Sequence, residues 1–172
     1  MAIEQAAYKV LIKEGDFEIR EYEPMIVAVS NEADLRGGGG FDTLFSYISG
    51  NNQEKKKIEM TTPVLNDLGQ EQETIAFVMP KEYSMDSIPK PLNSEVQLQE
   101  LPGRKVAVII FSGNINPVKI DEKKHELLAW LKEKEIIVKG LVELARYNPP
   151  FIPGFIKHNE LLMEVRLYLN NE

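Results

Sequence analysis

The sequence contains no cysteine, only two histidines and no long apolar run. The lack of cysteine excludes disulfides, thiolate catalysis and cysteine ligation of zinc or haem iron. Neither histidine is spaced with a second His, Asp or Glu as metalloenzymes require, so a structural or catalytic metal is not expected. No stretch approaches the roughly twenty apolar residues of a membrane span, and the first residues lack the basic and apolar segments of a secretory signal. The sequence therefore predicts a soluble, cytoplasmic protein without a membrane partner.

Acidic side chains outnumber basic ones by 27 to 20, which gives a net charge of −7. This surplus repels polyphosphates, and no helix-turn-helix segment fits the chain, so nucleic-acid binding is not expected. A length of 172 residues is sufficient for one domain, residues 1–172, with its own apolar core. The oligomeric state is left open.

Period-two runs of β-branched and aromatic residues alternate with two stretches of helical spacing. Strands are predicted over residues 10–13, 17–22, 25–31, 57–65, 74–80, 95–100, 106–111, 142–147 and 161–169, and helices over 41–48 and 117–134. Asn116-Pro117 suits the start of the second helix, because asparagine caps free amides and proline fits the first turn. Gly37–Gly40 matches no phosphate-binding pattern and predicts a mobile hinge.

The order of these elements is the same in two halves, about residues 8–82 and 94–170, joined by a proline-containing linker. We interpret this as an internal duplication of a β-α-β-β unit. Strand pairs flanking a helix, twice over, predict an α+β fold in which two helices pack on a curved antiparallel sheet.

Several segments resemble, in the same order, the SOUL or haem-binding-protein family over nearly the whole chain, from residue 8 to 165. They are Glu18–Pro24, Tyr47–Asn52, Lys57–Val64, Phe77–Pro80, Leu101–Gly103, Phe111–Gly113, Tyr147–Phe155 and His158–Glu160. The resemblance implies a distorted β-barrel of two repeats, similar to the effector-binding domains of multidrug-sensing regulators, with small molecules in a groove between the repeats. It also implies haem or a related tetrapyrrole as a ligand that is not required for folding.

In the family the proposed tetrapyrrole cleft involves the first helix and the segment matching 57–64, so Phe45, Lys57 and Met60 carry over as ligand contacts. A thioether contacts aromatic macrocycles well and can ligate iron. Period-two alternation places Met60 on one face with Ile58, and core packing is the alternative for it. Lys57 would meet a propionate, or it lies in an ordinary solvated turn.

Polar side chains share one face of the last two predicted strands: Glu143, Tyr147 and Glu164, together with Arg166. If this face is concave, Glu143 or Glu164 would recognise a cation, because an unpaired carboxylate in an apolar cup favours positive charge. The alternative is an ordinary surface on which Glu164 and Arg166 pair.

The proline-rich loop after residue 147 presents Phe151 and Phe155 from a stiff backbone and leads to His158. These aromatic rings would wall a flat ligand or cap the end of the barrel. His158 and Met60 are the candidate iron ligands, whereas His125 falls on the polar side of the second helix and is expected to face water.

The leading hypothesis is non-enzymatic binding of a flat, hydrophobic ligand, haem or another tetrapyrrole, in an apolar groove. A stand-alone effector-binding module for cationic or amphipathic molecules is the first alternative. A hydrolase with a groove glutamate as base and Tyr147 as proton donor is the second.

Overall fold

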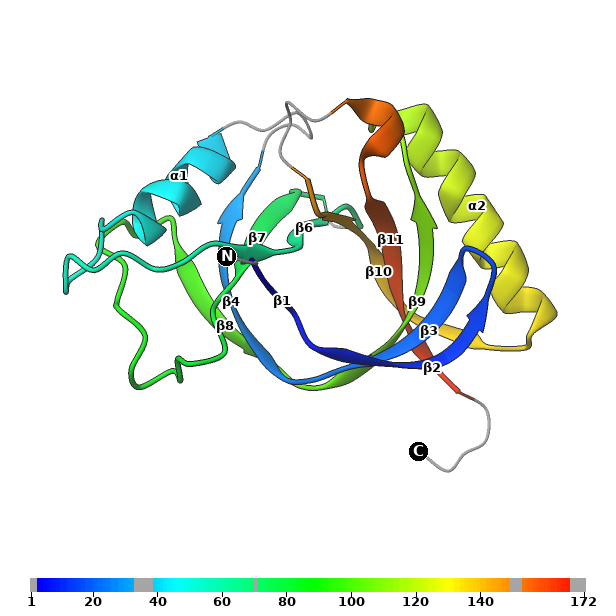
Figure 1. Ribbon diagram of the computed structural model, residues 1–172, viewed down its shortest axis with the longest axis horizontal. Helices are drawn as coiled ribbons and strands as arrows, with labels where there is room; N and C mark the ends of the chain where they lie inside the picture. The colour runs from blue at the N-terminus through cyan, green and yellow to red at the C-terminus, as the bar shows by residue number, and fades with distance from the viewer. Residues whose placement is uncertain (1–2, 33–38, 70, 149–152, 168–172) are drawn as a thin grey trace.

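Two helices lie on the outside of a strongly curved β-sheet in the computed structural model of the chain (Figure 1). The structure describes residues 3–32, 39–69, 71–148 and 153–167, with Phe155 described by its backbone alone. Its elements are β1 (Glu4–Gln5), β2 (Tyr8–Glu14), β3 (Phe17–Tyr22), β4 (Met25–Asn31), α1 (Gly39–Ile48), β5 (Thr61–Thr62), β6 (Val64–Asp67), β7 (Thr74–Val78), β8 (Gln97–Leu101), β9 (Arg104–Phe111), α2 (Pro117–Glu133), β10 (Ile137–Arg146), the 3-10 turn η1 (Gly154–Ile156) and β11 (Asn159–Arg166). Within these ranges neither helix is long and apolar enough to cross a membrane.

The large sheet has the strand order β2-β3-β9-β11-β10-β6-β7-β4-β8, and neighbouring strands in it are antiparallel. The predicted α+β class and the curved sheet with two helices are confirmed. The sheet does not close into a barrel, because its edge strands β2 and β8 have no described pairing with each other. A separate parallel pair joins β1 to β5, and Figure 1 shows β1 running in front of the large sheet toward β2.

The two predicted halves share this sheet because strands from the beginning of each half pair with the other half. β3 of the first half pairs with β9 of the second, and β8 of the second half pairs with β4 of the first. The halves also meet in the middle of the sheet, where β6 pairs with β10. Because each half completes the other's hydrogen bonding, we expect neither to fold alone; their origin by duplication stays a prediction.

Both faces of the sheet are buried. On the outer face, Ala107 and Ile109 of β9 belong to the apolar cluster under α2, whereas α1 covers a second cluster on the other half of the sheet. On the inner face, Val106 and Val108 belong to a third cluster, with Leu162 of β11. The hollow that the sequence suggested between the halves is therefore largely filled by the protein's own side chains, because strands apolar on both faces pack on both.

The predicted strand over residues 57–65 is wrong in its first half. Residues 53–60 contain no strand, and pairing begins only at Thr61. Thr61 and Pro63 are buried although alternation assigned them to the face opposite Met60. The Thr62–Pro63 peptide bond is cis, and β6 starts after it, so the segment does not keep one period-two register.

Glycines at 39 and 40 form the first turn of α1 rather than a hinge; Gly37 and Gly38 lie outside the described residues. A Cβ at position 40 would collide with the Asn31 carbonyl oxygen and lie 2.7 Å from Ile75 Cγ2. Glycine at position 40 therefore lets α1 approach β4 closely.

Asn52 holds the segment that follows α1. Its side chain is buried, donates to the carbonyls of Tyr47 (3.0 Å) and Lys56 (2.9 Å), and accepts from the Lys56 N–H (3.0 Å). The Ile58 N–H then donates to the carbonyl of Ile48 at 2.7 Å. Residues 56–58 are thus fixed against the C-terminal turn of α1.

We expect Asn52→Ala to lower the free energy of unfolding by about 1–3 kcal/mol, because it leaves buried backbone groups without partners. Urea denaturation measures the change. The neighbouring Asn51→Ala, at an exposed position, should cost less than about 0.5 kcal/mol; equal losses in the two variants would contradict the role of the Asn52 side chain.

Candidate functional site

The most unusual chemistry of the described chain is a buried ion pair on the inner face. Arg20 of β3 and Glu160 of β11 are each only 1% exposed. The Arg20 Nη1 and Nη2 atoms donate to the two carboxylate oxygens of Glu160 at 2.7 and 2.9 Å. The strands β3 and β11 both flank β9, so the pair joins them across it.

Further polar groups complete the coordination of the arginine. Its Nε donates to Glu18 Oε1 at 2.7 Å, and Nη1 also reaches the Tyr22 hydroxyl oxygen at 2.9 Å. The guanidinium lies 4.1 Å from the centre of the Tyr8 ring, a cation–π distance. Glu18, Arg20 and Tyr22 share this face because side chains alternate along a strand.

Two residues of the predicted site bind the other end of the pair. The Tyr147 hydroxyl donates to Glu160 Oε1 at 3.2 Å, and His158 Nε2 lies 2.7 Å from Glu160 Oε2. The rings of Tyr147 and His158 are 4.6 Å apart. We define the Arg20 network as Tyr8, Glu18, Arg20, Tyr22, Tyr147, His158 and Glu160.

The network keeps its charges despite burial. Burial alone would lower the pKa of Arg20, but the hydrogen bonds and the charge of Glu160 raise it. Burial likewise opposes ionisation of Glu160, yet hydrogen bonds from His158 and Arg20 hold the pKa of that carboxyl below its usual value. Burial raises the pKa of Tyr22 to about 12 and also raises that of Tyr147, so both phenols are neutral at neutral pH: Tyr22 accepts from Arg20, and Tyr147 donates to Glu160.

Tyr147 and His158 were predicted from the sequence as site residues, whereas the Arg20–Glu160 pair at the centre of the network was not. Alternation along β3 resembles that of a half-exposed strand, with Glu18 and Arg20 on the polar side. The available signal was the run of six consecutive apolar residues at 106–111, which is typical of a strand buried on both faces. A strand that pairs with it is covered on the same two faces, so the polar side chains of that neighbouring strand are buried as well.

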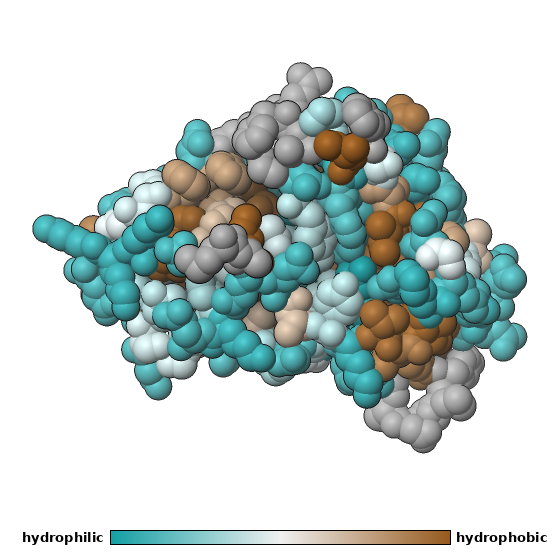
Figure 2. All heavy atoms as spheres, viewed as in Figure 1, coloured by the Kyte–Doolittle hydropathy of each residue, from teal (hydrophilic) through white to brown (hydrophobic). Residues whose placement is uncertain are grey.

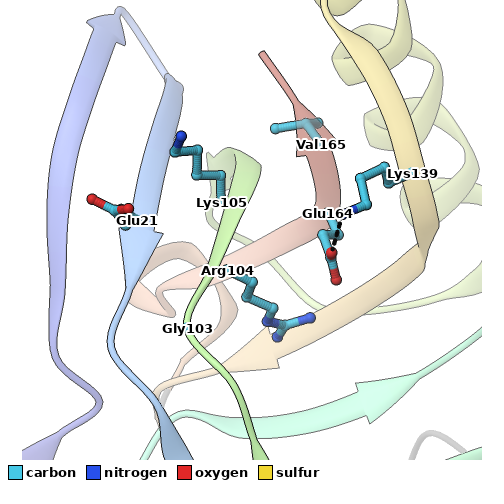
Figure 3. A pocket seen from close by; sticks show the side chains of 7 residues that line it. All are labelled: Glu21, Gly103, Arg104, Lys105, Lys139, Glu164 and Val165. Carbon is cyan, nitrogen blue, oxygen red and sulfur yellow. Dashed lines mark ion pairs between the residues drawn. The ribbon is translucent and has the colours of Figure 1, made fainter. Parts of the chain in front are cut away.

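The predicted acids Glu143 and Glu164 lie on the inner face, but each has its own cation. Glu143 accepts two hydrogen bonds from Arg104, at 2.6 and 3.1 Å. Glu164 pairs with Lys139 at 3.3 Å, as Figure 3 shows. Glu164, Arg104 and Lys139 line a polar cavity of about 200 Å³ beside the turn between β8 and β9. Neither carboxylate is an unpaired acid in an apolar cup.

The first-helix residues form a separate group on the outside of the molecule. Phe45 of α1 is 51% exposed and its ring stacks on Phe41, with centroids 6.1 Å apart and planes 11° apart. Phe41 and Met60 both pack against the apolar cluster under α1. Lys57 directly precedes Ile58, whose N–H donates to the Ile48 carbonyl at the end of α1, and the Lys57 side chain is 74% exposed. We call Phe41, Phe45, Lys57 and Met60 the α1 patch; Figure 2 shows apolar atoms exposed on this side of the molecule.

The residues predicted as one site therefore divide into two groups: the α1 patch outside, and Glu143, Tyr147, His158 and Glu164 on or beside the inner face. Phe151 and the Phe155 side chain lie outside the described residues. Two cavities among the described residues measure about 200 and 240 Å³, and both are smaller than the 300–1,000 Å³ of a typical drug-sized pocket.

Among the described residues, no group of three His, Asp or Glu side chains is placed so that it could hold a metal ion. His125 is exposed, as predicted, and contacts the Asp121 carbonyl oxygen one turn earlier on α2.

The match to a family model decides the family. The model described as "SOUL heme-binding protein" matches residues 3–164. The chain belongs to the SOUL family. Human Heme-binding protein 2 is 32% identical to it over 148 residues, which cover 79% of this chain and 72% of the human protein. The mouse protein of the same name is 28% identical, over 80% of this chain and 72% of its own.

Solved structures extend the SOUL fold to distant proteins. The C-terminal domain of EcmrR has a TM-score of 0.64 at 9% identity, covering 92% of this chain and 98% of that domain. A hydrolase from Listeria innocua has a TM-score of 0.67 at 10% identity, covering 88% of this chain and 92% of that protein. At such identities the likeness shows a common fold alone.

We expect Arg20→Met to lower the free energy of unfolding by about 3–5 kcal/mol, because it removes the guanidinium that neutralises Glu160 in the interior of this SOUL domain. The carboxylate then keeps only its contacts with Tyr147 and His158. Urea denaturation tests this. Lys13→Met is the matched control: Lys13 pairs with Glu18 at 3.0 Å with a side chain that is 60% exposed, and it should cost less than about 1 kcal/mol. A loss for Arg20→Met as small as that of the control would show that the network adds little.

Because the pKa of Glu160 is lowered in the folded protein, the free energy of unfolding depends on pH in the acid range. Since the folded pKa lies below the unfolded value of 4.5, its contribution is present above pH 4.5 and is lost as the pH falls through the folded pKa. Urea unfolding as a function of pH should therefore show a shallower acid loss for Glu160→Gln than for the unaltered protein. Glu59→Gln, at a side chain 80% exposed, should leave the slope unchanged; an unaltered slope in Glu160→Gln would refute the assignment.

Proposed function

We propose that this protein binds haem or a related tetrapyrrole on the α1 patch and carries it without changing it chemically. The observation that supports this most directly is the solvent-exposed, stacked ring of Phe45 on α1, in a chain whose family is described as heme-binding. An exposed aromatic ring on a buried apolar base offers a flat contact to a macrocycle.

The residues of the patch suit the parts of such a ligand. Phe45 and Phe41 would contact the macrocycle face, and the soft thioether of Met60 would pack at its edge. Lys57 is paired only loosely, at 4.0 Å from Glu59 with both side chains exposed, so it can turn toward a propionate. This positive charge matters because the net charge of −7 otherwise repels the anionic side of haem.

The proposed contact between the α1 patch and the macrocycle is mainly apolar. A bound haem would bring its iron as the reactive centre. Neither histidine lies in the α1 patch: His125 is on α2, and Nε2 of His158 is bound to Glu160. Met60 is the residue of the patch with a donor atom for iron. The chain's own contribution is to hold and orient the macrocycle and to neutralise its carboxylates.

The two alternatives have weaker support. Recognition of a cation by Glu143 or Glu164 has to displace Arg104 or Lys139. The hydrolase alternative has Glu143 or Glu164 as its base, and each of these carboxylates already holds a cation, Arg104 or Lys139.

Titration with hemin tests the proposal. We expect a saturable, red-shifted Soret band, with Phe45→Ser and Met60→Glu each weakening the affinity roughly tenfold, a loss of about 1.4 kcal/mol of apolar contact. Val118→Ser is the matched control, because Val118 is an apolar residue exposed to 69% on α2, away from the patch.

Haem adheres to many apolar surfaces, so an unrelated protein of similar net charge is titrated in parallel. Equal affinity for that protein, or an equal loss in Val118→Ser and Phe45→Ser, would refute specific binding at α1.

A further inference from the structure

A second cavity lies beneath the first strand of the chain. It measures about 240 Å³ and is bounded by residues 4–7 on one side and by the ends of β4 and β7 and the segment after β7 on the other. It shares none of its lining residues with the α1 patch or with the Arg20 network. Two of its lining residues, Ile26 and Met79, belong to the apolar cluster on which Phe41 and Met60 pack. The cavity therefore adjoins the α1 patch but offers a ligand a different set of contacts.

The floor of this cavity is apolar and well packed. Ile26, Val78 and Met79 contribute to it and are exposed by 9, 5 and 4%. An apolar cavity of about 150 Å³ is sufficient to bind benzene, so this one has room for a single ring with a short substituent. It is too small for a tetrapyrrole, which needs the several hundred Å³ of a drug-sized pocket.

The rim of the cavity is acidic. Glu4, Glu23 and Glu100 line it together with one ammonium group, that of Lys81. The Lys81 Nζ lies 3.2 Å from Glu23 Oε1, but both side chains are more than half exposed, so water screens the pair and it is weak. Three carboxylates against one ammonium group leave an excess negative charge at the mouth, which attracts a cation.

We propose that this cavity binds a small hydrophobic cation, a primary amine carried on a single ring. The ring occupies the floor of Ile26, Val78 and Met79, and the ammonium group lies at the rim among Glu4, Glu23 and Glu100. The Tyr83 ring, which also lines the cavity, offers a cation–π contact to the same ammonium group.

The first strand acts as the cover of the site. β1 pairs with β5 at two positions only. Beyond these, the Ala6 N–H donates to the Thr62 carbonyl at 3.0 Å, and the Ala7 carbonyl accepts from Glu23 at 3.1 Å. The Glu4 carboxylate also accepts from the Lys81 backbone N–H at 2.8 Å. Because these few hydrogen bonds lie at the margin of the molecule, β1 opens more readily than the main sheet, and a ligand bound beneath it would hold it closed.

Three probes of similar shape separate the contributions of ring and charge: benzylamine, which is protonated at neutral pH, benzyl alcohol and benzoate. Isothermal titration should give saturable binding of benzylamine, with benzyl alcohol at least about tenfold weaker and benzoate weaker still. Hydrogen exchange of the Ala6 and Glu23 amides should slow with benzylamine and not with benzoate.

Two variants locate the site. The double variant Glu23→Gln/Glu100→Gln should weaken benzylamine at least about tenfold and leave benzyl alcohol unchanged. Glu122→Gln, at an exposed position on α2, is the charge control and should change neither. Ala7→Phe fills the cavity and should abolish binding of both benzylamine and benzyl alcohol. If Ala7→Phe does not fold, the double variant Glu23→Gln/Glu100→Gln still tests the site.

Equal binding of benzylamine and benzyl alcohol would overturn the recognition of charge. No saturable binding of benzylamine, or an equal loss in Glu122→Gln and the glutamine pair, would overturn the site itself.

Discussion

The burial of the sheet on both faces is the constraint on which the rest of this structure depends. Two helices cover the outer face, and the inner face is filled by an apolar cluster and by the Arg20–Glu160 pair. The desolvation of two buried charges offsets much of their attraction, so such a pair adds little net stability. Its bidentate geometry, however, fits only one register of β3 relative to β11. The pair thereby ties together the two strands that flank β9.

This constraint also decides where a ligand can bind. The acids Glu143, Glu160 and Glu164 of the inner face are paired with Arg104, Arg20 and Lys139, and the cavity of about 200 Å³ beside them is polar. The described part of the inner face therefore suits a flat apolar ligand poorly. The available surfaces are at the margins: the exposed rings on α1 and the cavity beneath β1. The two suit different guests, because one is a flat apolar surface and the other a small cavity with an acidic mouth.

The relatives agree with this division between fold and site. Proteins at about 10% identity, among them the C-terminal domain of EcmrR and a hydrolase, share the curved sheet and its two helices. The SOUL match and the curated heme-binding proteins instead extend to sequence. A scaffold that buries both faces of its sheet tolerates change at its margins, where substitutions alter binding without disturbing the core.

The sequence by itself determined the elements whose signals are local. Asn116 caps α2 with a hydrogen bond from the Lys119 N–H, as predicted, and β3 and β4 begin and end where alternation and proline indicated, because capping and pleating depend on neighbours in the chain. Only the tertiary structure decided that residues 53–60 are not a strand, that the sheet stays open, and that Glu160 is the central acid. Those outcomes depend on contacts between residues far apart in sequence, such as the 140 positions that separate Arg20 from Glu160, and no local pattern encodes which partner a buried charge will meet.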